Sequence, residues 1–410
     1  MAPSILKLTA ATSLLSIFRS PNSCKAARMI NTVNKSDVES RTSVFSSSSP
    51  YLMLSPRSDT TSYELYNFAD KKILSIPKPD LKYEIESGSR DATKILGSSH
   101  GWLACFNHLR GDGGEIFLSN PLSGRRVNLP PIHKLLTASR SAQYWFTKIR
   151  MTCSDPESEE YRVVMKFGSE NRLALCCPGR SSNEWTILGS HQAKAYHDFV
   201  YCCKHELFFS LDFSNCRKLE AWDLKNPSSP SLVWSCDFSD LEMECDNGGE
   251  PSVEEEIQEF SDRREYLVTS QQGDLFLVKR YINRCMLPDG SCAPIDIPNE
   301  YKYPAKTISF DVYKIVQDGD KGKKVFMDGH LNGMVMFVGD ATQGIAIPGN
   351  DANGFKPNSI CFTNDNRSPN GTDNGIFDYK EKKLFFCYYP FDYTSLNNKI
   401  MPPPLWFTPN

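Results

Sequence analysis

Residues 266–281 read YLVTSQQGDLFLVKRY, and this stretch decides how the rest of the chain is interpreted. Two apolar runs, 266–269 and 275–281, flank a polar segment that contains Gly273 and Asp274. Short runs rich in Val, Leu, Phe and Tyr on both sides of a Gly-containing turn are typical of a β-hairpin. The stretch therefore predicts two antiparallel strands.

The same pattern recurs along the chain. Pairs of apolar runs flank turn residues at 95–97 and 102–106, at 161–167 and 173–177, and at 199–203 and 207–211. Further strand candidates lie at 116–118, 309–316, 334–338, 345–347, 360–362, 375–379 and 384–389. No long stretch after the N-terminus shows the 3.6-residue periodicity of a helix. The sequence predicts an all-β body.

An all-β body of about 350 residues is too large for a single β-sandwich and has many strand edges to protect. Four-stranded blades arranged around an axis leave only short edges, and each blade takes about 40–50 residues. We therefore expect a β-propeller of about six to eight blades. Two successive β-sandwiches are the alternative. Trp222-Asp223 occurs once, so there is no WD40 repeat.

The composition is that of a globular protein, with 40% hydrophobic and 23% charged residues in a chain of 410. The net charge of -3 gives no reason to expect nucleic-acid binding. No apolar run approaches the roughly 20 residues of a membrane-spanning helix. The 14 cysteines include two adjacent pairs, 176–177 and 202–203, but no CxxC pair. Most lie in apolar runs, which predicts buried, reduced cysteines.

The N-terminal segment, residues 1–36, contains five basic residues and no acidic residue. Ile5, Leu8, Leu15 and Phe18 recur at nearly helical spacing. Positive charge and an apolar stripe are typical of an organellar presequence. We expect mitochondrial import, because Arg19 and Arg28 are present; a chloroplast or cytoplasmic location, a secretory signal and a disordered tail are the alternatives.

Three segments make up the expected domain organisation: 1–36 for targeting, 37–60 as a Ser-rich linker and 61–410 as the propeller. Within the last, residues 237–265 carry 12 acidic and two basic residues. Such a charge excess is typical of a solvated loop inserted between strands.

The sequence at 97–101, GSSHG, matches the G-x-S-x-G pattern of the α/β-hydrolase nucleophile elbow. That elbow needs a strand before the serine and a helix after it. The residues that follow, WLACF, are strand-like instead. We expect a hairpin turn; an esterase that uses Ser99 is the alternative.

Other candidate sites lack the spacing that their chemistry requires. Zinc sites and calcium loops have characteristic ligand spacings, and a phosphate cradle precedes a helix. The residues considered are Cys202, Cys203, His205 and His197 for zinc; Cys285 and Cys292, which have no second pair; Asp318, Asp320 and Gly322 for calcium; Gly111–Gly114 for phosphate; and the basic cluster of Lys321, Lys323 and Lys324, expected in a solvated loop. We predict no catalytic residue, no cofactor-binding residue and no metal ligand.

Several ordered stretches resemble the KIB-type propeller family found in many plant F-box proteins, a family long labelled a domain of unknown function. They are GSSHGWL at 97–103, IFLSNP at 116–121, GRRVNLP at 124–130, YLV through GDLFLV at 266–278, FDVY at 310–313, MFVG at 336–339, KPNSI at 356–360 and GIFD at 375–378. In order and spacing they cover about residues 90–390.

The resemblance implies a propeller in which Trp102 and Phe310 belong to the cores of blades. Family members that act as substrate receptors of ubiquitin ligases carry an F-box near the N-terminus, where this chain has its basic, Ser-rich segment. The chain is similar to an organelle-targeted branch of the family that lacks the F-box. We expect a non-enzymatic binding protein with an unknown protein partner, and a ubiquitin-ligase receptor as the alternative.

Overall fold

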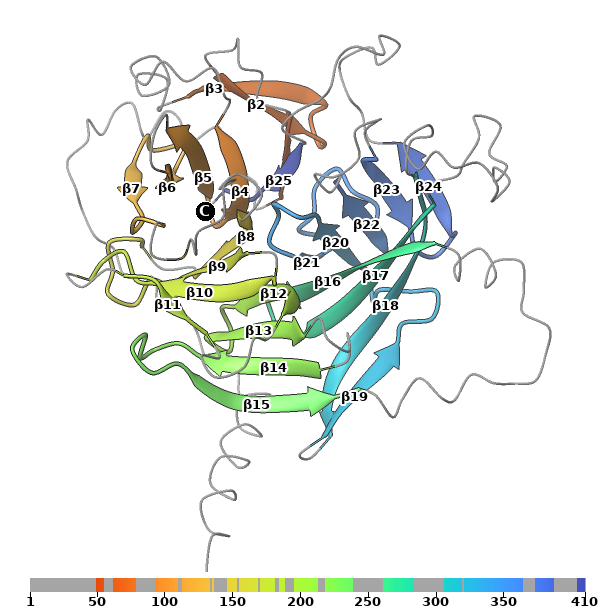
Figure 1. Ribbon diagram of the computed structural model, residues 1–410. Coiled ribbons are helices and arrows are strands. Elements are labelled where there is room, and N and C mark those ends of the chain that lie inside the picture. The colour runs from red at the N-terminus through yellow and green to blue at the C-terminus, as the bar shows by residue number, and fades with distance from the viewer. Residues whose placement is uncertain are drawn as a thin grey trace, which may run out of the picture.

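The computed structural model describes most of the chain after residue 48. The described residues are 49–54, 62–78, 93–109, 113–132, 135, 146–152, 155–168, 170–180, 184–188, 195–212, 218–238, 261–283, 306–318, 321–363, 373–386 and 404–409. All 25 named elements in these ranges are β-strands. They form a ring of blades around a central axis (Figure 1). The all-β prediction is confirmed.

Four blades are separate four-stranded antiparallel sheets. Blade 1 contains, from the axis outward, β25 (Leu405–Phe407), β1 (Tyr51–Met53), β2 (Ser62–Asn67) and β3 (Lys72–Pro77). Blade 2 contains β4 (Lys94–Ser99), β5 (Trp102–Leu109), β6 (Gly113–Ser119) and β7 (Arg126–Asn128). Blade 3 contains β8 (Phe146–Met151), β9 (Val163–Phe167), β10 (Arg172–Cys176) and β11 (Thr186–Ile187). Blade 4 contains β12 (Tyr196–Cys202), β13 (Leu207–Asp212), β14 (Lys218–Asp223) and β15 (Ser231–Asp237).

Blades 5 and 6 share one nine-stranded sheet. Blade 5 contains β16 (Asp262–Ser270), β17 (Leu275–Asn283), β18 (Lys306–Asp318) and β19 (Lys321–Phe326). Blade 6 contains β21 (Ile345–Pro348), β20 (Met334–Val338), β22 (Ser359–Phe362), β23 (Gly375–Asp378) and β24 (Lys383–Phe386). β21 pairs in parallel with β16, the innermost strand of blade 5, and this pairing joins the two blades.

Six hydrophobic clusters hold the ring together, and each lies between two neighbouring blades. Trp102 of blade 2 packs with Met165 of blade 3 in one cluster, and Phe310 of blade 5 packs with Phe362 of blade 6 in another. Both faces of every blade therefore pack against a neighbouring blade, which explains why a strand such as β13 is buried at all six positions. The prediction that Trp102 and Phe310 are blade-core residues is confirmed.

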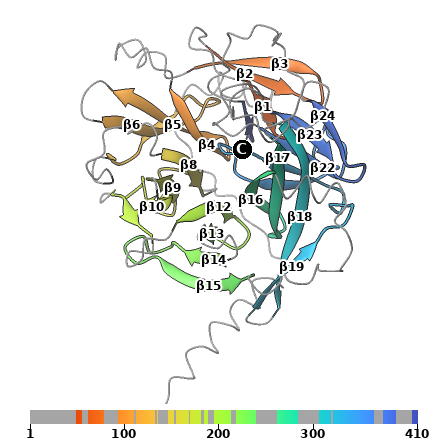
Figure 2. The same ribbon diagram turned by 45° about the vertical axis from the view of Figure 1, so that its right-hand side comes forward.

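The ring is closed by strands from the two ends of the described chain. β25 pairs antiparallel with β1, with Leu52 opposite Trp406. Trp406 and Phe407 are almost fully buried, and Trp406 contacts Phe337 of blade 6. The closed ring of six blades fits the lower end of the predicted range and excludes two successive sandwiches (Figure 2).

Two expected boundaries need correction. β1 lies inside the segment 37–60 expected to be a linker, so the propeller begins before residue 61; the boundary at 36 lies outside the described residues. The acidic segment 237–265 is also shorter than expected, because its first residue belongs to β15 and its last four to β16. Residues 239–260 lie outside the described part of the chain.

The seven cysteines in the described ranges are all free, and six are buried. They fill space between strands as small apolar side chains, as the sequence predicts. In the same ranges we find no helix with the length and apolarity needed to cross a membrane.

Candidate functional site

A short segment of blade 6, residues 339–344, lies on the axis of the ring; we call it the axial segment. It connects β20 to β21 and forms hydrogen bonds with the innermost strands of the other five blades. These bonds are Trp406 N to Thr342 Oγ1 (3.0 Å), Ser98 N to the Ala341 carbonyl (2.7 Å), Arg150 Nη2 to the Asp340 carbonyl (3.2 Å), Gln343 Nε2 to the Tyr201 carbonyl (3.2 Å) and Thr269 N to the Gly344 carbonyl (3.1 Å). The axis is thus occupied by backbone.

Glycines at both ends of the axial segment allow this close approach. A Cβ atom on Gly344 would lie 2.1 Å from the Leu267 carbonyl oxygen of β16. A Cβ atom on Gly339 would lie 2.2 Å from Thr363 Oγ1. The Leu267 carbonyl is backbone of an inner strand, so position 344 requires glycine for the segment to pass beside β16, whereas the contact at 339 is with a side chain that can rotate.

The innermost strands β4, β8, β12 and β16 run side by side in the same direction around the axis. We call the end at which they begin the starting end of the ring, and the other the finishing end. In three of them the strand-pairing register skips one residue near the starting end: Leu96, Thr147 and His197. Such bulges re-aim the side chains beside them. Lys148 and Asp198, which follow two of the bulges, form an ion pair.

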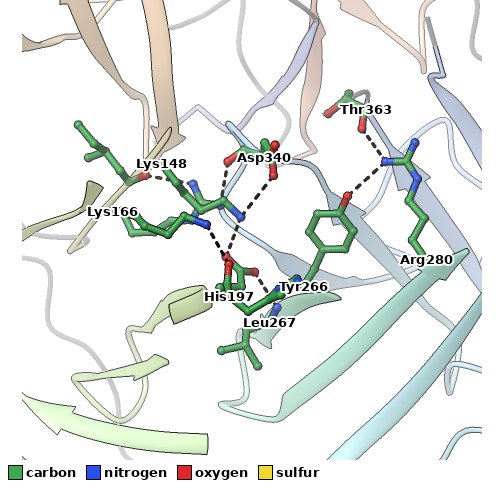
Figure 3. A network of polar contacts seen from close by, with 11 residues as sticks. Lys148, Lys166, His197, Tyr266, Leu267, Arg280, Asp340 and Thr363 are labelled. Atoms are coloured by element: carbon green, nitrogen blue, oxygen red, sulfur yellow. Dashed lines mark hydrogen bonds and ion pairs between the residues drawn. The ribbon is translucent and has the colours of Figure 1, made fainter. Parts of the chain in front are cut away.

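The ion pair of Lys148 and Asp198 is buried near the starting end (Figure 3). Lys148 Nζ lies 2.7 Å from Asp198 Oδ1, and the Leu267 backbone N–H donates to Asp198 Oδ2 at 2.9 Å. Burial by itself would raise the pKa of Asp198, but the charges of Lys148 and Arg150 and the two hydrogen bonds outweigh it and lower the pKa. Asp198 therefore stays ionised and links blades 3, 4 and 5.

Arg150 is buried two residues further along β8, with 1% of its surface exposed. Its Nη1 donates to the Ile149 carbonyl at 3.0 Å and its Nη2 to the Asp340 carbonyl, while its Nε is buried without a hydrogen-bond partner among the described residues. Burial lowers the pKa of Arg150 to about 10, partly offset by the charges of Asp198 and Asp340, so the guanidinium remains charged at neutral pH.

Four partly exposed side chains lie around this buried pair. Lys166 of β9 lies directly opposite Lys148 and donates to the His197 carbonyl at 3.0 Å. The Asp340 side chain is 35% exposed, with Oδ1 3.7 Å from Lys148 Nζ. Arg264 of β16 is near enough to influence both His197 and Asp340 electrostatically. The starting end thus gathers charged groups from three blades and the axial segment.

Burial sets the protonation state of two of these groups. It lowers the pKa of Lys166 to about 8, and repulsion from Lys148 acts in the same direction, against the attraction of Asp340 and Asp198. Burial also lowers the pKa of His197 to about 4, so the imidazole is neutral at pH 7. Among the described residues, the basic side chains here are Lys148, Arg150, Lys166 and Arg264, and the carboxylates are Asp198 and Asp340.

The finishing end is bridged between blades 2 and 4. Gln343 accepts a hydrogen bond from Ser99 Oγ at 3.0 Å and donates to the Tyr201 carbonyl. Beside it, His100 Nε2 lies 3.5 Å from Cys203 Sγ. Burial lowers the pKa of His100 to about 4, so this imidazole is also neutral. These contacts tie the two blades together across the axis.

The GSSHG sequence forms the hairpin turn that its residues predict. β4 ends at Ser99 and β5 begins at Trp102, with positive φ at His100 (48°) and Gly101 (75°). Two successive positive φ angles are the conformation of a type I′ turn between antiparallel strands. Ser99 is 3% exposed and bonded to Gln343. This is a strand–turn–strand unit, whereas a nucleophile elbow requires a following helix.

The residues considered for zinc are separated along blade 4. His197 lies near the start of β12 and Cys203 after its end, about 20 Å apart at the rise of a strand. His205 is bonded through Nε2 to the Gly273 carbonyl at 2.9 Å, and Cys202 is buried in the cluster between blades 4 and 5. No group of three or more His, Cys, Asp or Glu side chains in the described ranges is placed to hold a metal ion.

The remaining candidates fall partly outside the described residues. Cys285, Cys292, Asp320, Gly111 and Asp112 are among those outside. Gly322 packs tightly against Cys236, where a Cβ atom would lie 2.3 Å from the sulfur. The lysines at 321, 323 and 324 belong to strand β19, which corrects the expectation of a loop. Lys324 Nζ lies 5.2 Å from the ring centre of Phe238.

A second buried polar cluster joins blades 5 and 6 (Figure 3). Arg280 of β17 is fully buried, and its Nη2 lies 2.8 Å from Asp373 Oδ2. Its other donors reach Thr307 Oγ1, the Tyr266 hydroxyl and the Thr363 carbonyl. These contacts connect β17 and Tyr266 of blade 5 with Thr363 and Asp373 of blade 6.

Of the comparisons with known proteins, the one with protein families agrees with the architecture. The family model of the KIB1-4 beta-propeller matches residues 65–380. A search of curated protein sequences gave no significant match. Among solved structures, the beta-propeller domain of Cps50 (Swd1) from Myceliophteria thermophila is similar, with 9% identity and a TM-score of 0.31 over 64% of this chain and 78% of that one. A puromycin-hydrolyzing peptidase from Mycobacterium tuberculosis has 11% identity and a TM-score of 0.31, over 77% of this chain and 48% of the peptidase.

The family match covers more than three quarters of the chain and spans all the motifs from which the resemblance was inferred. It agrees with the propeller architecture of the described residues. The chain belongs to the KIB1-4 beta-propeller family.

Proposed function

We propose that this protein is a non-enzymatic interaction module and that its partner binds the starting end of the ring. The observation that carries the proposal is the set of partly exposed groups, Lys166, His197, Arg264 and Asp340, which three blades and the axial segment present together. Rigid scaffolds commonly carry binding residues in this way, at one end of the strands that position them.

Several features favour binding over catalysis. The serine of the GSSHG sequence is buried in a hairpin and bonded to Gln343. The neutral imidazoles of His100 and His197 lie near opposite ends of the ring, so they do not form one acid–base pair. The charged groups at the starting end are held by strands and by the axial segment, which suits recognition of a preformed surface.

The test compares two charge reversals on opposite ends of the ring. Arg264→Glu changes the starting end, and Lys204→Glu changes the turn between β12 and β13 at the finishing end. Three baits are used: the wild-type full chain and each of the two variants. The proteins that each bait captures are quantified by mass spectrometry. We expect at least one partner of the wild type to be lost with Arg264→Glu and kept with Lys204→Glu. Equal capture by all three baits would refute the proposal.

We also propose that the interaction takes place inside an organelle, in the first instance the mitochondrion. The support is the basic, acid-free composition of residues 1–36. A fluorescent protein fused to the C-terminus, with and without residues 1–36, tests the point. Organellar signal that depends on residues 1–36 is expected; cytosolic signal from both fusions would refute it.

A further inference from the structure

At the finishing end, a cysteine of blade 4 meets a histidine of blade 2. Cys203 directly follows β12, and His100 lies in the turn between β4 and β5. His100 Nε2 lies 3.5 Å from Cys203 Sγ, within hydrogen-bonding distance for sulfur. The two residues are 103 positions apart in the sequence, so this contact exists only because the ring brings the two blades together. It places a thiol beside a group that can accept its proton.

Cys203 differs from the other cysteines that the structure describes. Six of the seven are buried, whereas Cys203 is partly exposed. Its neighbour Cys202 is 1% exposed and packs into the cluster between blades 4 and 5. Burial in apolar surroundings raises the pKa of a thiol, as at Cys176, and makes the thiol unreactive. Among the described thiols, Cys203 is therefore the one that a reagent in solution can reach.

The turn fixes His100 beside this sulfur. The φ angles of 48° at His100 and 75° at Gly101 define the turn, and the Gly101 N–H donates to the Thr408 carbonyl at 2.7 Å. Because burial lowers the pKa of His100 to about 4, the imidazole is neutral at pH 7, and a neutral imidazole has one nitrogen that can accept a proton. A thiol and a base within hydrogen-bonding distance form the arrangement by which proteins activate a nucleophilic cysteine.

We propose that Cys203 is a site of oxidative modification, at which hydrogen peroxide oxidises the thiol to a sulfenic acid and His100 accepts the thiol proton. A small, uncharged oxidant can reach a sulfur that is only partly exposed. Susceptibility to this oxidation follows the exposure of a thiol and the ease with which it loses its proton, and the pair supplies both. Cys203 lies at the finishing end, so its oxidation does not depend on a partner at the starting end.

The oxidation is a two-electron step. The sulfur of Cys203 attacks one oxygen of hydrogen peroxide, so that an S–O bond forms and the O–O bond breaks. The thiol proton passes to the imidazole of His100, and from there to the departing hydroxide, which leaves as water. The products are one sulfenic acid and one water molecule, with the sulfur oxidised, the peroxide reduced and the imidazole neutral again.

The experiment compares neighbouring cysteines within one molecule. The full chain is reduced, freed of reductant and treated with hydrogen peroxide at pH 7 in the presence of dimedone, which traps sulfenic acids. Peptide mass spectrometry then measures the labelling rate of each cysteine. Cys202 and Cys203 lie on the tryptic peptide 195–204, and fragment ions separate the two. We expect Cys203 to be labelled at least about tenfold faster than Cys202, and faster than the buried pair Cys176 and Cys177.

His100→Asn tests the imidazole and keeps the turn. Asn-Gly is the preferred sequence of a type I′ turn, so the hairpin is retained and the urea midpoint is not expected to fall. Labelling of Cys203 should slow by about tenfold or more, because a positioned base typically contributes roughly 10²–10⁴-fold to a reaction that moves a proton. His330→Asn, the same substitution at an exposed histidine between β19 and β20, is the matched control and should leave the rate unchanged.

Two results would each overturn the modification site. The first is wild-type Cys203 labelled no faster than Cys202, and this comparison does not depend on the folding of any variant. The second is labelling of Cys203 in His100→Asn as fast as in the wild type or faster, because exposure alone would then govern the thiol. Slow labelling of Cys202 in His100→Asn shows that the ring stays closed, so a lower rate at Cys203 then reflects the lost imidazole.

Discussion

Replacing Asp198 by Asn is expected to destabilise the protein by about 3 kcal/mol at neutral pH, because it breaks a buried ion pair from one side. Asn has the same shape and keeps an acceptor for the Leu267 N–H. The substitution therefore removes only the negative charge opposite Lys148, whose side chain is 3% exposed. Removing one partner of a buried ion pair usually lowers the free energy of unfolding by about 3–5 kcal/mol. We expect the lower value here, because Asp340 remains 3.7 Å from the Lys148 amine.

The assay is urea unfolding of the full chain, followed by tryptophan fluorescence. With a slope near 3 kcal/mol per M, the expected loss lowers the midpoint by about 1 M. The effect depends on pH in a defined direction. The pKa of Asp198 is lowered in the folded protein, so the ion pair contributes above the unfolded pKa, near 4, and this contribution is lost as the pH falls through the folded value. The difference between wild type and Asp198→Asn should shrink below about pH 4.

Lys148→Met serves as the second arm of a double-mutant cycle. By itself, Lys148→Met leaves the Asp198 carboxylate without its paired charge, and it is expected to lower the free energy of unfolding by a similar amount. Combined with Asp198→Asn it removes both charges, so the double variant should be more stable than the sum of the single losses by about 1–3 kcal/mol. Additive losses, or a loss below about 0.5 kcal/mol for Asp198→Asn, would show that the pair does not link the blades.

Three other changes test the ring and its axis. Gly344→Ala places a Cβ atom 2.1 Å from the Leu267 carbonyl and should cost about 2–4 kcal/mol in urea unfolding, whereas Gly329→Ala, where no atom lies within 4 Å but φ is 68°, should cost only about 1 kcal/mol; equal losses would contradict the close approach. Asp373→Asn removes the carboxylate of buried Arg280 and should cost about 3–5 kcal/mol, and a neutral result would show that the Arg280 cluster does not join blades 5 and 6. Ending the chain at residue 403 removes β25 with its buried Leu405, Trp406 and Phe407, and at about 2–5 kcal/mol for each buried side chain the loss is comparable to the roughly 5–15 kcal/mol total stability of a typical domain. Cooperative unfolding should therefore be lost or strongly weakened; an unchanged urea midpoint would show that the ring does not need its closing strand.

The hairpins could be predicted because each is encoded locally. At 266–278 and 97–103 the apolar runs and the turn residues between them are adjacent in the sequence, and the structure places antiparallel strands there. β1 and β25 could not be predicted in this way. Each has three residues, and their pairing partners lie more than 350 positions apart, so only closure of the ring makes them strands.

The candidate site had no local signal. Lys166 is the single polar residue of β9, and Lys148 stands in β8 beside Thr147 and near Arg150; in both places an exposed lysine is the ordinary expectation. The burial of Lys148 follows from the packing of blade 3 against blade 4, which brings Asp198 within 2.7 Å of its amine. The axial segment, GDATQG at 339–344, has the composition of a surface turn. Its two glycines were the available signal, but glycine in a turn-like segment does not distinguish an exposed loop from one that crosses the axis.

Ring closure by β25 has a consequence for biosynthesis. During translation blade 1 lacks its innermost strand until residues 405–407 have left the ribosome, and until then one edge of β1 remains open to pairing with other chains. Contacts between such distant residues also form slowly, because a long loop must close first. Until that strand emerges the nascent chain is an open arc of blades, and a chaperone that covers strand edges would have its greatest effect in that interval.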